Sequence, residues 1–246
     1  MMIPAMGGVS PLTIYGKANV PWWCNIDNRI DGATPPGIET ETNLADPTNC
    51  NITQPFNGAQ PFLTQINDRN WADFIPTSDH WDLDPIGTAL WPIGAPALCL
   101  YVAARFDTLD ATRTIVDIGV TGTGGSNTGI SLLGVTTNRV FGRVFAGGVL
   151  ASAILTGQTP GELAIWRVLF ADGFVSIRKN RETPVAVARS GTMTNAGLHI
   201  SVGRNNGNGG TMDGAAREFV LTTVNPTAQQ DDETMDYLSN NSGIAV

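Results

Sequence analysis

Paired carboxylates are the first residues of this sequence that could perform chemistry. Hydrolysis of a glycosidic bond needs two carboxyl groups that flank the same bond. The closest alternation is Asp82-Leu83-Asp84, in a stretch rich in tryptophan and proline that is not typical of a core strand. Asp213 and Glu218 lie five residues apart, and Asp117 stands alone in its segment. The sequence therefore predicts no enzyme, and a glycan hydrolase with an unrecognised acid pair is the weakest alternative.

The two histidines limit nucleophilic catalysis. A serine or cysteine nucleophile needs a neighbouring base, which is most often a histidine, and this chain contains His80 and His199. His199 lies within an expected strand, where a half-exposed sheet position is the commoner explanation. The glycine-rich segments 122–125 and 207–210 have no lysine and no following helix, so they indicate hairpin turns and not phosphate loops. We predict no catalytic residue, no cofactor and no cofactor-binding residue.

Loops rich in oxygen ligands could bind a calcium ion, since Ca²⁺ prefers carboxylate and amide oxygens. Two sets of side chains qualify: Asp79, Asp82 and Asp84, or Asn205, Asn206, Asn208 and Asp213. The same residue types are those that turns require, and no spacing matches an EF-hand. The sequence therefore predicts no metal site, with calcium as the alternative.

Four tryptophans could stack on sugar rings: Trp22, Trp23, Trp81 and Trp91. Large aromatic side chains are more often buried in a core or an interface, where their area contributes most. We therefore interpret these rings as buried, and sugar stacking as the alternative.

Composition and charge exclude several classes of protein. The chain has 246 residues, is 42% hydrophobic and 15% charged, and carries a formal net charge of −8. That charge argues against nucleic-acid binding. No apolar run reaches the roughly 18–20 residues of a membrane span, and the N-terminus lacks the order of a secretion signal. Cys24, Cys50 and Cys99 match no zinc pattern and leave at least one thiol unpaired. We predict three buried free thiols, with a disulfide as the alternative.

Residues 97–222 have the pattern of ten short strands separated by turn residues. Asp172-Gly173 is the strongest hairpin signal in the chain. The expected strands are 97–107, 113–120, 129–135, 140–145, 150–155, 162–171, 174–179, 185–189, 198–203 and 216–222. Ten strands without intervening helices indicate a β-sandwich or a barrel.

One short helix is expected at the end of the chain. Thr227 is a candidate N-cap, and acidic residues at 231–233 follow near the helix start, where the helix dipole favours negative charge. Met235 and Leu238 are spaced to face the sandwich. We interpret the acidic cluster as helix-end electrostatics and not as a catalytic site.

The front of the chain has little periodicity of either kind. The first 96 residues contain 12 of the 15 prolines and five of the six tryptophans. Residues 1–110 carry a net charge of −8, whereas residues 111–246 are neutral. We predict an irregular N-terminal arm or docking segment at 1–42 and a β-domain at 43–246.

Two parts of the sequence resemble concanavalin A-like (LamG-like jelly-roll) domains. The first comprises residues 43–46, 51–54, 60–61, 66–68 and 71–74, a polar loop, a proline and a short strand before the long strand 97–107. The second comprises residues 198–204, a Gly/Asn loop, residues 212–220 and the helix through Tyr237-Leu238. The resemblance covers 43–246 and implies an all-β, concanavalin A-like jelly-roll β-sandwich. Lectins, glycosidases, adhesins and phage particle proteins share these patterns, so the fold alone assigns no function.

The cations of this chain favour an assembly role. Lys17 and Lys179 are its two lysines, and arginine, which persists in buried interfaces through bidentate pairing, supplies the other positive charges. With its irregular front, the chain is similar to bacteriophage particle proteins. We predict a non-enzymatic virion structural protein, specifically a capsid decoration (cement) protein.

The predicted partners and location follow from that role. They are other virion proteins (major capsid or tail proteins) and further copies of the chain in a homo-oligomer such as a trimer. The location is the virion, after assembly in the host cytoplasm, with no nucleic-acid binding and no membrane insertion. The alternative is a receptor- or carbohydrate-binding, lectin-like tail or appendage protein whose partner is a cell-surface glycan.

Overall fold

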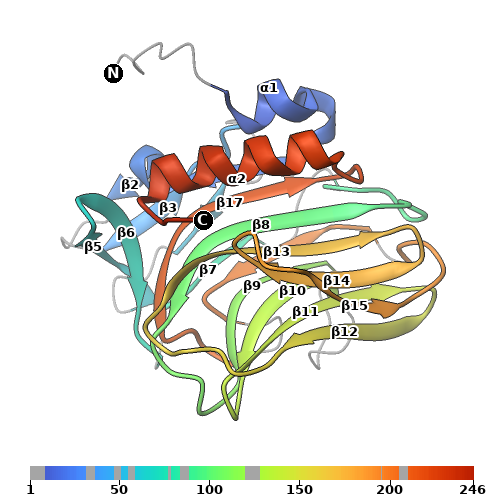
Figure 1. Cartoon of the computed structure of the whole chain (residues 1–246). Coiled ribbons are helices and arrows are strands. Elements are labelled where there is room, and N and C mark those ends of the chain that lie inside the picture. Colours follow the sequence, from blue (N-terminus) through green and yellow to red (C-terminus); the bar gives the residue numbers. More distant parts are fainter. Residues whose placement is uncertain are drawn as a thin grey trace.

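The computed structural model describes residues 9–31, 37–46, 51–54, 59–76, 79–83, 89–119, 128–194, 196–204 and 210–246. The strands of this part of the chain form an eight-stranded and a nine-stranded sheet that pack face to face (Figure 1). Neighbouring strands run antiparallel. This architecture confirms the predicted all-β sandwich.

The eight-stranded sheet has the order β15-β14-β13-β8-β17-β6-β5, and β1 also pairs with β17. Its strands are β15 (Val185–Ala188), β14 (Phe174–Lys179), β13 (Leu163–Ala171), β8 (Leu98–Phe106), β17 (Gly214–Thr222), β6 (Arg69–Phe74), β5 (Phe62–Ile66) and β1 (Trp22–Asn25). Asp172 and Gly173 connect β13 to β14 with φ angles of 52° and 79°. Both residues adopt the left-handed conformation of a tight hairpin turn, which confirms the hairpin predicted from this dipeptide.

The nine-stranded sheet has the order β12-β11-β10-β9-β16-β7-β4-β3-β2. Its strands are β12 (Val149–Leu155), β11 (Arg139–Ala146), β10 (Thr128–Val135), β9 (Arg113–Gly119), β16 (His199–Val202), β7 (Trp81–Leu83), β4 (Ile52–Thr53), β3 (Ile38–Glu41) and β2 (Ile30–Asp31). The ten strands predicted between residues 97 and 222 therefore all form, with ends shifted by at most two residues.

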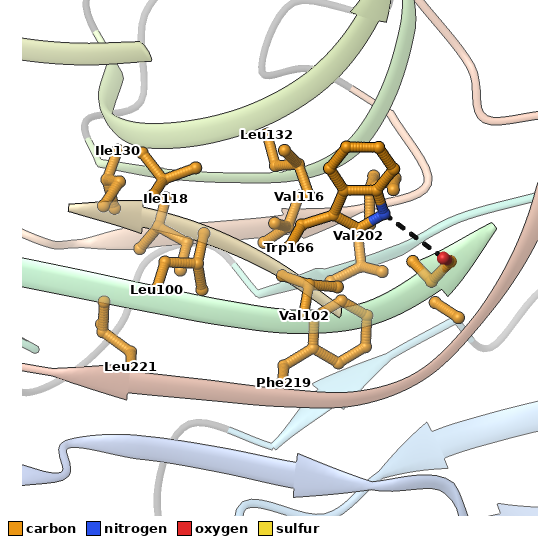
Figure 2. Close-up of a cluster of buried hydrophobic side chains, with 14 of the residues drawn as sticks. Leu100, Val102, Val116, Ile118, Ile130, Leu132, Trp166, Val202, Phe219 and Leu221 are labelled. Atoms are coloured by element: carbon orange, nitrogen blue, oxygen red, sulfur yellow. Dashed lines mark hydrogen bonds between the residues drawn. The ribbon is translucent and has the colours of Figure 1, made fainter. Parts of the chain in front are cut away.

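The main hydrophobic core lies between the two sheets (Figure 2). One sheet contributes Leu100, Val102, Phe219 and Leu221, and the other contributes Val116, Ile118, Ile130, Leu132 and Val202. Trp166 completes the layer, and its indole Nε1 donates a hydrogen bond to the carbonyl oxygen of Ala104 at 3.3 Å. Because successive strand residues point to opposite faces, the residues between these core positions face outward.

Two helices pack on the outer face of the eight-stranded sheet (Figure 1). The C-terminal helix α2 (Ala228–Ser242) begins at the predicted N-cap Thr227, and Met235 and Leu238 are buried against the sheet as expected. Helix α1 (Pro11–Tyr15) was not predicted, and Tyr15 joins the same buried cluster. Two 3₁₀ turns, η1 (Lys17–Asn19) and η2 (Ile26–Asn28), flank β1. None of the described helices is long and apolar enough to span a membrane.

The front of the chain contributes strands to both sheets. Trp22 in β1 is fully buried and stacks on Phe219 at a ring-centroid distance of 5.4 Å. β3 pairs with β4 in the nine-stranded sheet. These strands show no hydrophobic periodicity in the sequence because they are only two to four residues long, and their formation depends on pairing with partner strands. The division into a docking segment at 1–42 and a jelly-roll domain at 43–246 stays a prediction.

Two of the three cysteines lie in the described part of the chain. Cys24 and Cys99 are both buried, as predicted, and Cys50 lies outside the described residues. Burial raises the pKa of the Cys99 thiol to about 12. This thiol therefore stays protonated at neutral pH and packs as a small apolar group.

Candidate functional site

A line of polar side chains crosses the outer face of the nine-stranded sheet. Its members, called the polar row from here on, are cross-strand partners on β12, β11, β10, β9, β16 and β7: Ser152, Arg143, Ser131, Asp117, Ser201 and Asp82. Five strand spacings make the row about 24 Å long. Asp117, Ser131 and Ser201 in the middle of the row are buried, whereas Asp82 at one end and Arg143 and Ser152 at the other are partly exposed.

The core sets the orientation of the polar row. On β9, Val116 and Ile118 point into the space between the sheets, so Asp117 between them points outward (Figure 2). Ser131 lies in the same way between Ile130 and Leu132 on β10. The antiparallel register then aligns Asp117 with Ser131. A one-residue slip of either strand would turn its polar residue into the core, so the hydrophobic pattern fixes the row.

Asp82 forms one end of the row and is held by several neighbours. The hydroxyl of Ser201 donates a hydrogen bond to its Oδ1 at 2.5 Å, and the Arg204 guanidinium forms an ion pair with its Oδ2. His80 Nε2 lies 3.5 Å from the same oxygen, and Gln54 contacts His80. The ion pair with Arg204 and the hydrogen bond from Ser201 therefore hold the Asp82 carboxylate in one position.

The other end of the row lies beside an aromatic ring between two arginines. Arg139, Phe141 and Arg143 alternate on β11 and share its outer face. The guanidinium carbons of Arg139 and Arg143 lie 5.5 Å and 5.2 Å from the centroid of the Phe141 ring. Both distances are within the range of cation–π attraction. Burial lowers the pKa of Arg143 from its usual value, and the attraction of Asp117 opposes that shift.

The outer face of the eight-stranded sheet holds charged groups, but α2 covers them. Asp231 of α2 accepts from the Arg167 guanidinium at 2.6 Å, and Arg178 Nη2 lies 2.8 Å from the same oxygen. Tyr101 donates to the other oxygen of Asp231 at 2.8 Å. This network sits under the helix, so its role is to hold α2 and not to meet a ligand. The sequence predicted that the acids at 231–233 act only on the helix end. Asp231 also forms two buried ion pairs, with Arg167 and Arg178.

Glu218 is the other buried carboxylate of that face. Trp23 Nε1 and the Tyr237 hydroxyl donate to its Oε1 at 2.8 Å and 2.7 Å, and Asn25 and Asn241 donate to its Oε2 at 2.9 Å and 3.4 Å. Burial raises the pKa of Glu218, and these donors oppose the shift. Glu218 connects β1, β17 and α2, so it is a structural group.

The pH dependence of stability tests this assignment. The folded state binds the Glu218 proton more tightly than the unfolded chain, whose glutamate pKa is about 4.3. The resulting stability is present below that pKa and is lost as the pH rises through the folded pKa. The glutamine of the Glu218→Gln variant does not titrate, so the variant is the reference. The unfolding free energy of the wild type minus that of the variant should fall as the pH rises above about 4, and it should level off above the pKa of the folded state. Urea unfolding at several pH values measures this difference in free energy. A difference that rises with pH would contradict the burial of the Glu218 carboxyl.

Most of the sequence-predicted candidates lie elsewhere or serve the fold. Asp79 is buried and accepts from the amide of Ile75 at 3.0 Å, and Asp213 accepts from Thr108 at 2.7 Å. His199 lies on β16, a central strand of the nine-stranded sheet, and is buried rather than half-exposed. Within the described residues no three His, Cys, Asp or Glu side chains are grouped to hold a metal ion. The remaining candidates lie outside those residues: Asp84, Asn205, Asn206, Asn208, and most of the segments 122–125 and 207–210.

The four tryptophans serve packing. Trp22, Trp81 and Trp91 are at most 1% exposed, which confirms the predicted burial. Trp23 is partly exposed, with its indole Nε1 bound to Glu218. Sugar stacking on the three buried rings is therefore not available in this structure.

Sequence reasoning missed Ser131, Ser201 and the group around Phe141. It noted Asp117 and Asp82 as isolated or doubtful acids, because register between distant strands is not visible in one sequence. One local signal was present. In the strand Arg-Val-Phe-Gly-Arg-Val-Phe-Ala, small or apolar residues alternate with arginine and phenylalanine, so one face carries cations and rings.

No protein-family model matches this sequence, and no curated protein gives a significant match. The fold is similar to Trypanosoma rangeli sialidase in complex with a difluorinated KDN derivative, with a TM-score of 0.59, 11% identity, and coverage of 91% of this chain and 33% of that chain. It is also similar to the receptor-binding domain of botulinum neurotoxin mosaic serotype C/D, with a TM-score of 0.59, 9% identity, and coverage of 90% of this chain and 51% of that chain. This chain thus spans about a third to a half of the length of these structures. At such identities the likeness shows a shared lectin-like β-sandwich fold.

The comparisons contradict the prediction that the chain is not an enzyme. Sialidases, which are enzymes, are among the structures that share its fold. The prediction relied on the lack of a recognisable carboxylate pair in the sequence, and that lack does not exclude catalysis on this fold. The likeness assigns no reaction and no catalytic residue to this chain.

Proposed function

We propose that this chain is a carbohydrate-binding, lectin-like domain and that the polar row is its binding face. The observation that carries the proposal is the row itself, six cross-strand polar partners on the outer face of the nine-stranded sheet. Both described helices cover the other sheet instead. The structural neighbours support the proposal, since they include sialidase complexes with sialic acid derivatives and a receptor-binding domain.

The chemistry of the row suits a sugar. Sugar hydroxyls both donate and accept hydrogen bonds, and the partly exposed members of the row offer the Asp82 carboxylate, the Ser152 hydroxyl and the Arg143 guanidinium. The partly exposed ring of Phe141 offers an apolar surface beside them for the C–H groups of a sugar. A ligand would contact the partly exposed groups at the ends of the row.

The virion role receives no support from the structure or the comparisons and stays a prediction. The same holds for the virion location, the capsid or tail partners and the homo-oligomer. A receptor- or carbohydrate-binding appendage, the alternative from the sequence analysis, agrees better with the polar row and with the neighbours.

A glycan array with a matched pair of variants tests the proposal. Phe141→Ala removes the ring at the polar row, and we expect it to weaken binding at least about tenfold, which corresponds to about 1.4 kcal/mol. Phe174→Ala is the control, because Phe174 is a phenylalanine that is 50% exposed on the other sheet. It should bind like the wild type. Wild-type protein that binds no glycan, or equal loss in both variants, would contradict the proposed face.

A further inference from the structure

Two arginines of β11 differ from most cations of this chain. Eight of the twelve arginines lie within 4.0 Å of a carboxylate oxygen in the described part of the chain. Arg139 and Arg143 have no such ion pair among the described residues, although the chain carries a net charge of −8. The buried Asp117 attracts Arg143 electrostatically, but neither arginine is within ion-pair distance of a carboxylate of the described residues. Positive charge on this sheet face is therefore available for a ligand.

The contacts of both arginines with Phe141 use none of their N–H donors, and one donor, Arg139 Nε, binds the Thr136 carbonyl instead. Arg139 and Arg143 lie on either side of Phe141 along β11, with guanidinium carbons 5.5 Å and 5.2 Å from its centroid. A guanidinium that packs on a ring through its flat face keeps its N–H donors at its edge. Those donors have the fork geometry that matches a carboxylate or sulfate group. Phe141 therefore orders two anion-binding groups without consuming their hydrogen bonds.

Arg143 has the more complete surroundings of the two. Ser131 on β10 and Ser152 on β12 are its cross-strand partners, so a hydroxyl lies on each side of it. Its side chain is partly buried, and its Nε has no hydrogen-bond partner among the described residues. A charge-assisted hydrogen bond gains strength where water is partly excluded. Arg143 is thus placed to be the main donor, and Arg139, whose Nε donates to the Thr136 carbonyl at 3.2 Å, the second.

We infer that this end of the polar row binds the anionic group of an acidic sugar, with Arg143 as the principal donor and Arg139 as the second. The inference rests on the proposed carbohydrate-binding function and adds the class of sugar. The shared chemistry is a carboxylate or sulfate on a glycan. The Asp82 end of the row, where a carboxylate is anchored by Arg204, would bind neutral hydroxyls of the same glycan.

Isothermal titration calorimetry with matched sugar pairs tests the inference. The pairs are trigalacturonic acid and its methyl ester, 3′-sialyllactose and lactose, and a heparin-derived tetrasaccharide and its desulfated form. The first two pairs probe carboxylate and the third probes sulfate. We expect the charged member of at least one pair to bind about 10- to 100-fold more tightly at low salt, and to lose most of that advantage at high salt.

Three variants assign the effect to the arginines. Arg143→Gln should abolish the difference in affinity between the charged sugar and its neutral partner, and Arg139→Gln should reduce that difference less. Arg69→Gln removes the same charge from an exposed position on β6 and should leave the preference unchanged. The inference is overturned if no charged sugar binds more tightly than its neutral partner, or if Arg143→Gln keeps the preference. If neutral sugars still bind and Phe141→Ala still weakens them, the proposed function stands without the inference. If none of the sugars or array glycans binds, both fail.

Discussion

Replacing Asp231 with alanine is expected to lower the free energy of unfolding by about 3–5 kcal/mol. The Asp231 carboxylate accepts from Arg167 at 2.6 Å and from Tyr101 at 2.8 Å, and lies 2.8 Å from Arg178 Nη2. Its removal leaves two guanidinium groups under helix α2 without an anion. An uncompensated buried charge costs far more than the loss of an exposed pair. Urea unfolding followed by circular dichroism measures the change.

Asp232→Ala is the matched control for this experiment. Asp232 is the next residue of the same helix and is exposed. The control repeats the loss of a negative charge near the helix start, and its effect should stay within about 1 kcal/mol. Equal losses for the two variants would mean that the Asp231 network does not hold the helix on the sheet.

Replacing Trp22 with alanine is also expected to cost about 3–5 kcal/mol of unfolding free energy. Trp22 is fully buried between the sheets and stacks on Phe219. Its removal leaves a cavity that the surrounding strands of a close-packed core cannot fill. Since small domains are stable by about 5–15 kcal/mol, this single change would remove much of the total.

The same experiment decides whether the front of the chain is part of the sandwich. Phe62→Ala is the control, because Phe62 is 39% exposed on the edge strand β5 and should cost less than about 1 kcal/mol. If Trp22→Ala unfolds at the same urea concentration as the wild type, residues 1–42 are a separable segment, as the sequence predicted. A large loss makes β1 a structural strand of the core.

The fold could be predicted where local patterns are strong. The strands after residue 97 are long enough for alternation and are separated by turn residues such as Asp172-Gly173, so hydrophobic periodicity located them. Thr227 and the spacing of Met235 and Leu238 located α2 for the same reason. The short strands β1 to β4 were not predicted, because two to four residues carry no periodicity and their formation depends on pairing with distant segments.

The candidate site could not be predicted because it depends on register. Asp117 and Ser201 are 84 residues apart in sequence and become direct neighbours through the pairing of β9 with β16. Composition drew attention to the tryptophans, and the structure places Trp22, Trp81 and Trp91 in the core. The ring beside the polar row is Phe141, in a strand whose alternation of arginine and phenylalanine was overlooked. Residue type alone therefore pointed to the wrong aromatic side chains.

The most direct test of the central claim is a map of the glycan-binding surface by NMR. The ¹⁵N-labelled chain would be titrated with the tightest ligand from the glycan array, and backbone shift changes assigned along the sequence. The polar row predicts that the largest changes occur in β9, β10, β11 and β16, with the residues around Asp117, Ser131 and Arg143 among them. Changes concentrated in α2 and the outer face of the eight-stranded sheet, with none along the polar row, would contradict the account.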